Sequence, residues 1–263
     1  LKKEFHIKLY KNNKGTSFTE VSEAAGVSRS GFPNAVSASD FNNDGWTDLY
    51  IANDFAAPDF FFINNQDGTF TYKTEEAFQH IPYYSMGVDV ADFNNDNLLD
   101  LFVVDMVAQD NYRLKSNMSG MNPKAFWKVV DDGGHYQYMY NTLQMNNGSG
   151  TFSDIGQYTG MAATDWSWAN LIADFDNDGL KDTYVTNGLL RDIRNTDADK
   201  EVAHYINQLT FKWVQEHPDG GGIESIFDIL KIDDVVKLIP SQPLKNFAFK
   251  NQGNLKFTEA QQD

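Results

Sequence analysis

Cysteine is absent from the 263 residues, and its absence excludes disulfides, thiolate metal sites and cysteine nucleophiles. Basic residues are few, because 21 Lys and Arg stand against 37 Asp and Glu, which gives a formal net charge of -16. Such an acidic chain is a poor partner for nucleic acid. Long apolar runs are also missing: no segment approaches the roughly 18 to 20 residues of a membrane-spanning helix. We therefore expect no nucleic-acid partner and no transmembrane segment in this chain.

Two repeats alternate along the chain. The first is an acidic loop, which reads "DFNNDGWTD" from Asp40, "DFNNDNLLD" from Asp92 and "DFDNDGLKD" from Asp174. Short apolar segments of the kind found in strands flank each copy. The second repeat is a hairpin with Asn and Gly between two β-prone runs, and it starts at Leu9, Phe61, Leu143 and Phe247. Asn and Gly supply the positive φ angles that a tight strand reversal requires.

One acidic loop with its flanking strands and one hairpin make four strands, the content of one propeller blade. The repeats therefore predict an all-β fold, a partial β-propeller of about three and a half four-stranded blades with helical insertions. The helix of the second insertion is expected to be capped by Thr196 and to end at the glycine run 220–222. Three and a half blades do not close a ring, so we expect residues 1–263 to be one segment of a larger propeller. The expected spans are a half blade at 5–22, blades at 35–75, 86–155 and 167–260, and insertions at about 105–140 and 188–245.

The spacing of the acidic loops predicts metal sites. Side chains at positions 1, 3, 5 and 9, with the carbonyl of position 7, can surround a Ca²⁺ ion with oxygen. Position 6 needs a sharp turn, which Gly45, Asn97 and Gly179 tolerate. The predicted ligands are Asp40, Asn42, Asp44, Trp46 and Asp48 in the first loop, Asp92, Asn94, Asp96, Leu98 and Asp100 in the second, and Asp174, Asp176, Asp178, Leu180 and Asp182 in the third.

Alternatives to three calcium ions remain open at this point. Turns favour Asp, Asn and Gly without any metal, and Mg²⁺ also takes oxygen ligands, although in a stricter geometry. An EF-hand is excluded, because it requires Glu at position 12, where this chain has Ile51, Val103 or Val185. With four carboxylates, the third loop is expected to bind most tightly.

These motifs resemble a known family. "DFNNDGWTDL", "DFDNDGLKD" and the hairpins "NNQDGTF" and "NNGSGTF" are similar to the FG-GAP, or VCBS, repeats of seven-bladed propellers such as the integrin α-chain head. The segment 141–188 more specifically resembles bacterial surface proteins that carry such repeats ahead of an ASPIC/UnbV domain. The resemblance implies a β-propeller with Ca²⁺ between the first two strands of each blade, at the cell surface or outside the cell, with the bacterial outer-membrane surface as the expected place. It implies no activity, and Asn97 departs from the usual Gly.

No catalytic motif is visible. The five histidines show no metal-ligand spacing, and neither GxSxG nor HExxH occurs. Inserted loops commonly carry recognition, which favours Trp127, His135 and Tyr136 as ligand-binding residues. Paired aromatics before a strand, here Trp166 and Trp168, are more often part of a core. An Arg beside an Asp, here Arg191, more often forms a structural salt link. The candidate ligand-binding residues are Trp127, His135, Tyr136, Trp166, Trp168 and Arg191.

The sequence thus favours a non-catalytic, calcium-binding module at a cell surface that recognises a protein or a glycan through its inserted loops. One alternative is a calcium-dependent polysaccharide-processing enzyme such as a lyase, which can use Tyr, His, Lys or Arg without a short signature. Another is a structural subunit of an outer-surface assembly.

Overall fold

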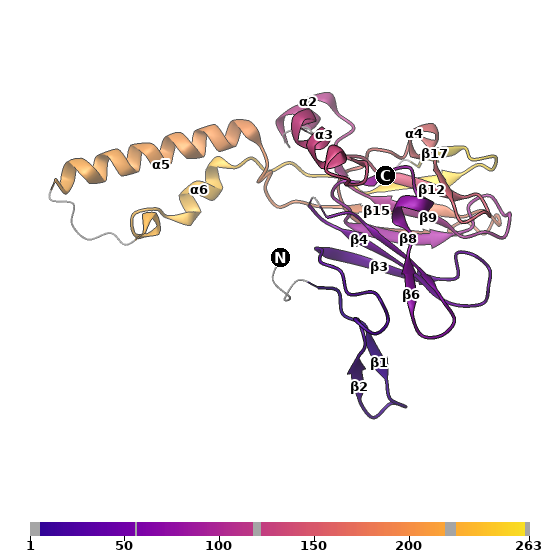
Figure 1. Cartoon of the computed structure of the whole chain (residues 1–263). Helices are drawn as coiled ribbons and strands as arrows, with labels where there is room; N and C mark the ends of the chain where they lie inside the picture. Colours follow the sequence, from indigo (N-terminus) through magenta and orange to yellow (C-terminus); the bar gives the residue numbers. More distant parts are fainter. Residues whose placement is uncertain (1–5, 56, 118–121, 219–224, 261–263) are drawn as a thin grey trace. The chain divides into compact units, whose positions relative to one another are not determined.

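Antiparallel strands are the commonest regular element of the structure (Figure 1), a computed structural model that describes residues 6–55, 57–117, 122–218 and 225–260. The chain divides into two units. The first runs through the described parts of Leu1–Val107, Pro123–Gly188 and Lys245–Asp263, and the second through those of Ala108–Asn122 and Leu189–Leu244. The second unit is thus built from two insertions into the first.

The first unit contains three sheets that each hold four antiparallel strands paired in chain order, and a short fifth strand joins the third sheet. The strands are β3 (Pro33–Ser39), β4 (Asp48–Asn53), β5 (Phe60–Asn64) and β6 (Phe70–Tyr72) in the first sheet, β8 (Gly87–Ala91), β9 (Asp100–Val104), β12 (Thr142–Asn146) and β13 (Phe152–Asp154) in the second, and β14 (Asp165–Ala173), β15 (Asp182–Asn187), β16 (Phe247–Asn251) and β17 (Phe257–Glu259) in the third. This up-and-down order is propeller-like, as the all-β prediction requires.

Shorter elements complete the first unit. Strand β10 (Met106–Val107) pairs with β14, and β7 (Ile81–Pro82) pairs in parallel with β11 (Gln137–Tyr138). The hairpin of β1 (Tyr10–Asn12) and β2 (Phe18–Glu20) stands before the first sheet. The helices are α1 (Thr74–Ala77), α3 (Pro123–Asp131) and α4 (Gly156–Thr159).

All four expected hairpins form: β1–β2, β5–β6, β12–β13 and β16–β17 each pair antiparallel. The repeated asparagine explains the tight reversal. The side-chain oxygens of Asn64, Asn146 and Asn251 each accept the backbone N–H two residues on, at 2.9–3.0 Å. An Asn side chain that mimics a backbone turn in this way is a common turn device.

Strand β9 shows how the sheets stack. All five of its residues are buried, and successive side chains of a strand point to opposite faces. Leu101 and Val103 enter the core between the first and second sheets, whereas Phe102 and Val104 enter the core between the second and third. A continuous apolar run is therefore what a strand covered on both faces needs.

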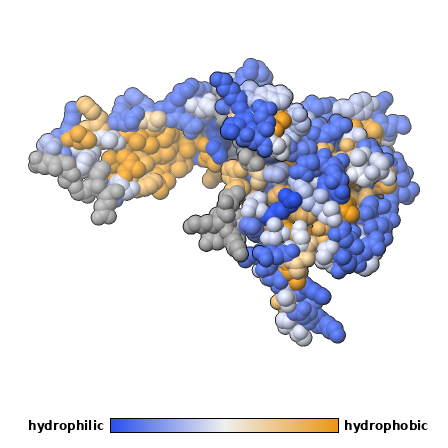
Figure 2. Space-filling model, viewed as in Figure 1, coloured by the Kyte–Doolittle hydropathy of each residue, from blue (hydrophilic) through white to orange (hydrophobic). Residues whose placement is uncertain are grey.

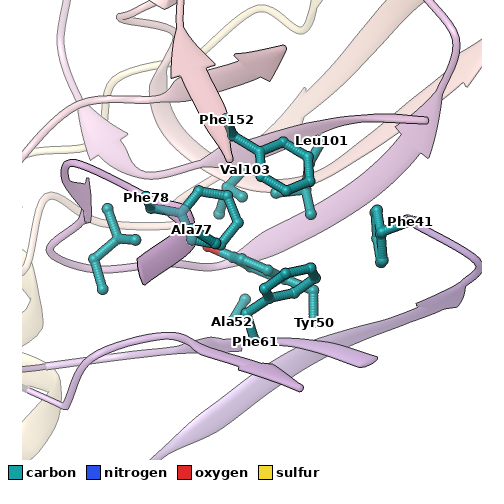
Figure 3. Packing of buried hydrophobic residues seen from close by; sticks show 10 residues of the cluster. Phe41, Tyr50, Ala52, Phe61, Ala77, Phe78, Leu101, Val103 and Phe152 are labelled. Carbon is teal, nitrogen blue, oxygen red and sulfur yellow. The ribbon is translucent and has the colours of Figure 1, made fainter. Parts of the chain in front are cut away.

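Aromatic rings fill the core between the first and second sheets (Figure 3). Phe61 of β5 meets Phe152 of β13 edge to face, with ring centroids 5.7 Å apart, and Phe78 stacks on Phe152 at 4.8 Å. Phe41, from the first acidic loop, packs on both Phe61 and Phe152. Such pairs add to the stabilisation that burial of their area supplies.

The second unit is helical. It contains α2 (Asn111–Ser116), α5 (Thr196–Glu216), a 3₁₀ turn (Ile226–Asp228) and α6 (Ile232–Leu238). Hydrophobic residues gather along one side of α5 and over α6 (Figure 2), and Phe211, Val214, Phe227 and Ile232 are exposed. None of the helices in the described ranges combines the length and hydropathy that a bilayer crossing requires.

One detail of the α5 prediction is corrected. The helix begins at Thr196, but its cap is Asn195, whose side-chain oxygen accepts the N–H groups of Asp197 and Ala198 at 3.1 and 3.0 Å. Asn caps a helix at least as well as Thr, so the cap moves one residue towards the N-terminus. The helix ends at Glu216. The glycine run 220–222 and residue 5, the expected start of the half blade, lie outside the described residues. The blade number and the blade spans stay predictions.

Candidate metal sites

The three acidic loops occupy equivalent places, because each joins the first two strands of one sheet: β3 to β4, β8 to β9, and β14 to β15. Their backbones share two left-handed residues. Position 6 has φ of 85° at Gly45, 68° at Asn97 and 88° at Gly179. Position 4, always Asn, has φ of 57°, 60° and 62° in the three loops. The sequence predicted a turn at position 6 and missed the one at position 4, although Asn is the non-glycine residue that most often tolerates this conformation.

Hydrogen bonds from the backbone fix the carboxylate at position 1. Asp40 accepts the N–H groups of Asp44 and Gly45, at 3.1 and 2.7 Å, through its two oxygens. Asp92 and Asp174 accept the N–H groups of positions 5 and 6 in the same way, at 2.8–3.0 Å. The carboxylate of position 5 accepts the N–H of position 7 at 2.8–2.9 Å in every loop. The acidic side chains therefore turn inward and order the loop.

The aspartate at position 9 has a second role that the sequence did not reveal. Asp48, Asp100 and Asp182 are buried. One oxygen of each accepts the N–H of the Phe at position 2, at 2.9–3.1 Å, and the other accepts the N–H of the first hairpin asparagine, at 2.8–2.9 Å. This side chain therefore fastens the acidic loop to the third strand of its own sheet. Each oxygen keeps a second lone pair, which a cation could use.

Burial affects the titration of this position. Removal from water raises the pKa of Asp48, and it raises the pKa of Asp100 to about 6, although hydrogen bonds from the backbone act in the opposite direction. The other loop carboxylates add to the increase through their charge. A cation in the loop would oppose both causes, because it favours the ionised carboxyl.

The third loop gathers its carboxylates most closely. Asp174, Asp176 and Asp182 each place an oxygen within 4.8 Å of the others, and they are the only three acidic groups that do so among the described residues. Lys250 of β16 forms ion pairs with Asp176 and, at 3.4 Å, with Asp178. Its hydrogen bond lowers the pKa of Asp176. A lysine ammonium therefore already neutralises part of this loop.

The donor set fits a hard divalent cation. Every predicted side-chain ligand is a carboxylate or an amide, so the loops offer oxygen and no sulfur or imidazole nitrogen. Such donors suit Ca²⁺ or Mg²⁺ rather than a soft metal. Asp40, Asn42 and Asp44, with their counterparts in the other loops, are the residues that would hold the ion.

Adjacent loops contact one another through repeated hydrogen bonds. Asn43 donates to the carbonyl of Asn97 at 3.0 Å, and Asn95, its counterpart one sheet on, donates to the carbonyl of Gly179 at 3.3 Å. The hairpin asparagine of each following sheet reaches back in the same manner: Asn146 to the carbonyl of Phe41 at 2.8 Å, and Asn251 to that of Phe93 at 3.0 Å. The three candidate sites thus form one connected row.

The other predicted binding residues are scattered. Trp127 and Tyr136, on α3 and just before β11, are 54% and 40% exposed. His135 beside them is half-buried, and burial lowers its pKa. Of the two tryptophans on β14, Trp166 is buried and Trp168 is exposed, with its ring N–H donating to the carbonyl of Gly188 at 2.5 Å.

The sixth predicted binding residue, Arg191, lies in the second unit, where it donates to the carbonyl of Ile239 at 3.2 Å. Its neighbour Asp192 forms a buried ion pair at 3.1 Å, but with Arg113, 79 residues away. Sequence reasoning missed this partner because nothing in the local pattern marks it.

Comparison with known proteins agrees with the repeat pattern. A family model described as "FG-GAP-like repeat" matches residues 40–103 and 129–185, and no curated protein matches the chain. A solved structure described as the basis of specific recognition of non-reducing terminal N-acetylglucosamine by an Agrocybe aegerita lectin is 18% identical, with a TM-score of 0.34. The alignment covers 70% of this chain and 43% of that one, and a likeness at this level supports no statement about function. FG-GAP-like repeats are therefore found at residues 40–103 and 129–185 of this chain.

Proposed function

We propose that this chain is a non-catalytic calcium-binding module that recognises a protein or a glycan at a cell surface. The observation that carries the proposal is the row of three equivalent loops, in which the carboxylates at positions 1 and 5 turn inward. The oxygen of position 3 lies beside them, as Asn42, Asn94 and Asp176 show. Carboxylates held this close together repel one another, so a cation among them stabilises the fold. We infer about three ions, one for each loop.

Calcium suits these loops better than magnesium does. Calcium accepts six to eight oxygen ligands in a flexible arrangement, whereas magnesium demands a near-ideal octahedron and keeps several waters. The loops lie at the exposed end of the sheets, and sites of this kind bind weakly enough to need millimolar calcium. Such concentrations occur outside the cell, so we place the protein at the cell surface or in the extracellular space, as the resemblance to bacterial surface proteins also suggests.

The recognition surface we propose is the insertion around α3 and β11. Phe126 stacks on Tyr138 with centroids 5.4 Å apart, and Tyr138 stacks on Tyr140 at 5.9 Å. This row of rings supports the exposed Trp127 and Tyr136. Aromatic side chains lose little entropy on binding and offer large contact areas, so the surface suits a protein or glycan ligand.

An enzymatic role receives less support from the same region. Tyr140 and Asp154 both lie within hydrogen-bond distance of the His80 ring, at 2.9 and 3.0 Å, an arrangement that could serve a lyase. Burial, however, raises the pKa of Tyr140 to about 12. The phenol therefore stays protonated near neutral pH and is a weak base. Turnover of an acidic polysaccharide that is lost in Tyr140→Phe would favour the lyase instead.

We also propose that the chain is a segment of a larger propeller. The Phe at position 2 of each loop supports this view: Phe41 and Phe93 are 4% and 2% exposed beneath the next sheet, whereas Phe175 is 52% exposed. A further sheet of the same kind would cover Phe175 and would place a hairpin asparagine next to its carbonyl.

Terbium luminescence tests the calcium proposal. Tb³⁺ has calcium-like coordination, and Trp46 at position 7 of the first loop can transfer excitation energy to it. We expect green emission on Tb³⁺ addition that millimolar Ca²⁺ reverses. Trp46→Leu, which copies position 7 of the other loops, should remove most of this emission while calcium binding persists. Absence of any emission that calcium can displace would contradict the proposal.

A further inference from the structure

A cavity opens at the other end of β4 from the first acidic loop. It has a volume of about 390 Å³ and is lined by His6, Gly31, Phe32, Pro33, Asn34, Asp54 and Phe55. Its lining comes from the start of β3 and the two residues before it, from the two residues after β4, and from His6, which bridges to Ser30. The size falls within the range of small-molecule sites, and the cavity shares no residue with the proposed metal loops or with the aromatic insertion.

The lining is richer in hydrogen-bond acceptors than in donors. The ring nitrogens of His6 are taken up by Ser28 and Ser30, at 3.1 and 2.9 Å. The amide nitrogen of Asn34 donates to the carbonyl of Ser85 at 3.1 Å and to the sulfur of Met86 at 3.2 Å, so its oxygen is the group that remains. Asp54 contributes a carboxylate. A ligand that matches this lining therefore brings donors and a positive charge rather than acceptors.

Two aromatic rings line the same cavity as that carboxylate. Phe32 and Phe55 meet edge to face, with centroids 5.2 Å apart, and the N–H of Asp54 donates to the carbonyl of Phe32 at 2.9 Å. A cation is attracted to the face of an aromatic ring as well as to a carboxylate. Lining of this composition suits an ammonium group, which both the ring and the carboxylate attract.

The backbone at Phe55 is strained. Its φ is +59°, a conformation that a bulky residue rarely adopts. One oxygen of Asp54 accepts the N–H of Phe55 at 2.7 Å and thereby helps to hold it. Strained residues cluster at ligand sites, where the surrounding structure holds them in place for function. Glycine would adopt the same backbone without strain, yet the chain has a large ring here.

The first sheet alone has this arrangement. Asp54 follows Asn53 at the end of β4. At the equivalent places, Met106 follows Asp105 after β9, and Gly188 follows Asn187 at the end of β15. The carboxylate and its aromatic neighbour are thus absent from the equivalent ends of β9 and β15. We propose that this cavity binds an ammonium group, carried by a lysine side chain or by a small alkylamine, between the Asp54 carboxylate and the rings of Phe32 and Phe55.

Calorimetric titration of the full chain tests the proposal. The probes are Nα-acetyl-lysine methylamide, its uncharged counterpart Nα-acetyl-norleucine methylamide, and ethylammonium chloride. We expect the lysine or the ethylammonium probe to bind with a dissociation constant below about 10 mM, and the norleucine probe not to bind. Preference for the lysine probe identifies a side chain as the source, and preference for ethylammonium identifies a small amine. Equal binding of the norleucine probe, or no binding by either cation, would overturn the proposal.

Three variants locate the site. Asp54→Asn should weaken binding by about tenfold or more, whereas Asp67→Asn, which removes the same charge from the β5–β6 hairpin, should leave it unchanged. Phe55→Gly should abolish binding while the melting temperature stays the same or rises, because glycine relieves the left-handed strain. Wild-type affinity in Asp54→Asn, or equal losses in Asp54→Asn and Asp67→Asn, would show that the cavity does not recognise the cation.

Discussion

At the scale of single residues, the position just before the third strand holds a buried aspartate in the first sheet and an asparagine in the other two sheets. The side chains of Asp59, Asn141 and Asn246 precede the third strand of the three sheets, and each accepts a backbone N–H from the end of the neighbouring second strand, at 2.7–2.8 Å. Burial raises the pKa of Asp59 to about 7, and the charge of Asp105 adds to the increase. An amide at this position makes the same hydrogen bond without a titrating group.

Asp59 should make stability depend on pH. Its folded pKa of about 7 lies above the ordinary value of 3.8, so the folded state holds a proton that the unfolded state releases between about pH 4 and 7. Stability conferred by this group is therefore present at low pH and is lost as pH rises through that window. Asp59→Asn should flatten the decline and should be more stable than the wild type at pH 8. Urea unfolding at pH 5, 6, 7 and 8 measures this, and an unchanged slope would refute it.

Lys250 should compete with a cation for the third loop. Its ammonium pairs with Asp176 and Asp178, so a metal ion must displace it. Met145 holds the equivalent position in the second sheet, and Lys250→Met therefore removes the competitor with a side chain that this fold already accepts. Calcium titration should show the third site strengthened by several-fold to about tenfold. Equal or weaker calcium binding by the variant would contradict this role.

At the scale of elements, the aspartate of position 9 links loop and sheet independently of metal. Asp100 accepts the N–H groups of Phe93 and Asn146, both at 2.9 Å, in a buried place. Asp100→Ala leaves two buried donors unpaired, which should cost roughly 2–4 kcal/mol. Asp96→Ala, in the same loop but exposed, should cost less than about 1 kcal/mol. Chemical denaturation in EDTA, which removes metal, measures the free energy of unfolding of both variants. A loss in Asp100→Ala as small as that in Asp96→Ala would show that Asp100 acts only through a metal ion.

Packing between sheets gives a second prediction at this scale. Phe93 is buried against Phe257, with ring centroids 5.7 Å apart, whereas its counterpart Phe175 is exposed. Phe93→Ala should lower the free energy of unfolding by about 3–5 kcal/mol, and Phe175→Ala should change it by less than about 0.5 kcal/mol. Thermal or urea unfolding of the two variants decides this. A large loss at Phe175 would mean that the third sheet is already covered in solution.

Much of the first unit could be predicted because it repeats. The hairpins follow from Asn and Gly between β-prone runs, and the row of loops follows from the spacing of Asp40, Asp92 and Asp174. Contacts that do not repeat had no local signal. The Arg113–Asp192 pair joins residues from two insertions, and Lys250 reaches an acidic loop 74 residues away. The Asp54 carboxylate that holds the left-handed Phe55 lies outside the acidic-loop and hairpin repeats, so the repeat pattern does not mark it.

At the scale of the whole molecule, the first unit is a stack of sheets with one core between the first and second sheets and another between the second and third. Stability in such a repeat is a sum of each sheet and its interfaces. The acidic loops lie in a hydrogen-bonded row across these interfaces, so ions bound there would stabilise the stack as a whole. Removal of calcium should then weaken the complete first unit rather than one loop.

Calcium-dependent thermal unfolding, together with a calorimetric count of bound ions, tests the central claim most directly. We predict about three calcium ions per chain and a melting temperature that rises with millimolar calcium and falls on addition of EDTA. Each site filled at about 100 times its dissociation constant should add roughly 2.7 kcal/mol. No heat of binding and an identical melting temperature in calcium and in EDTA would contradict the account.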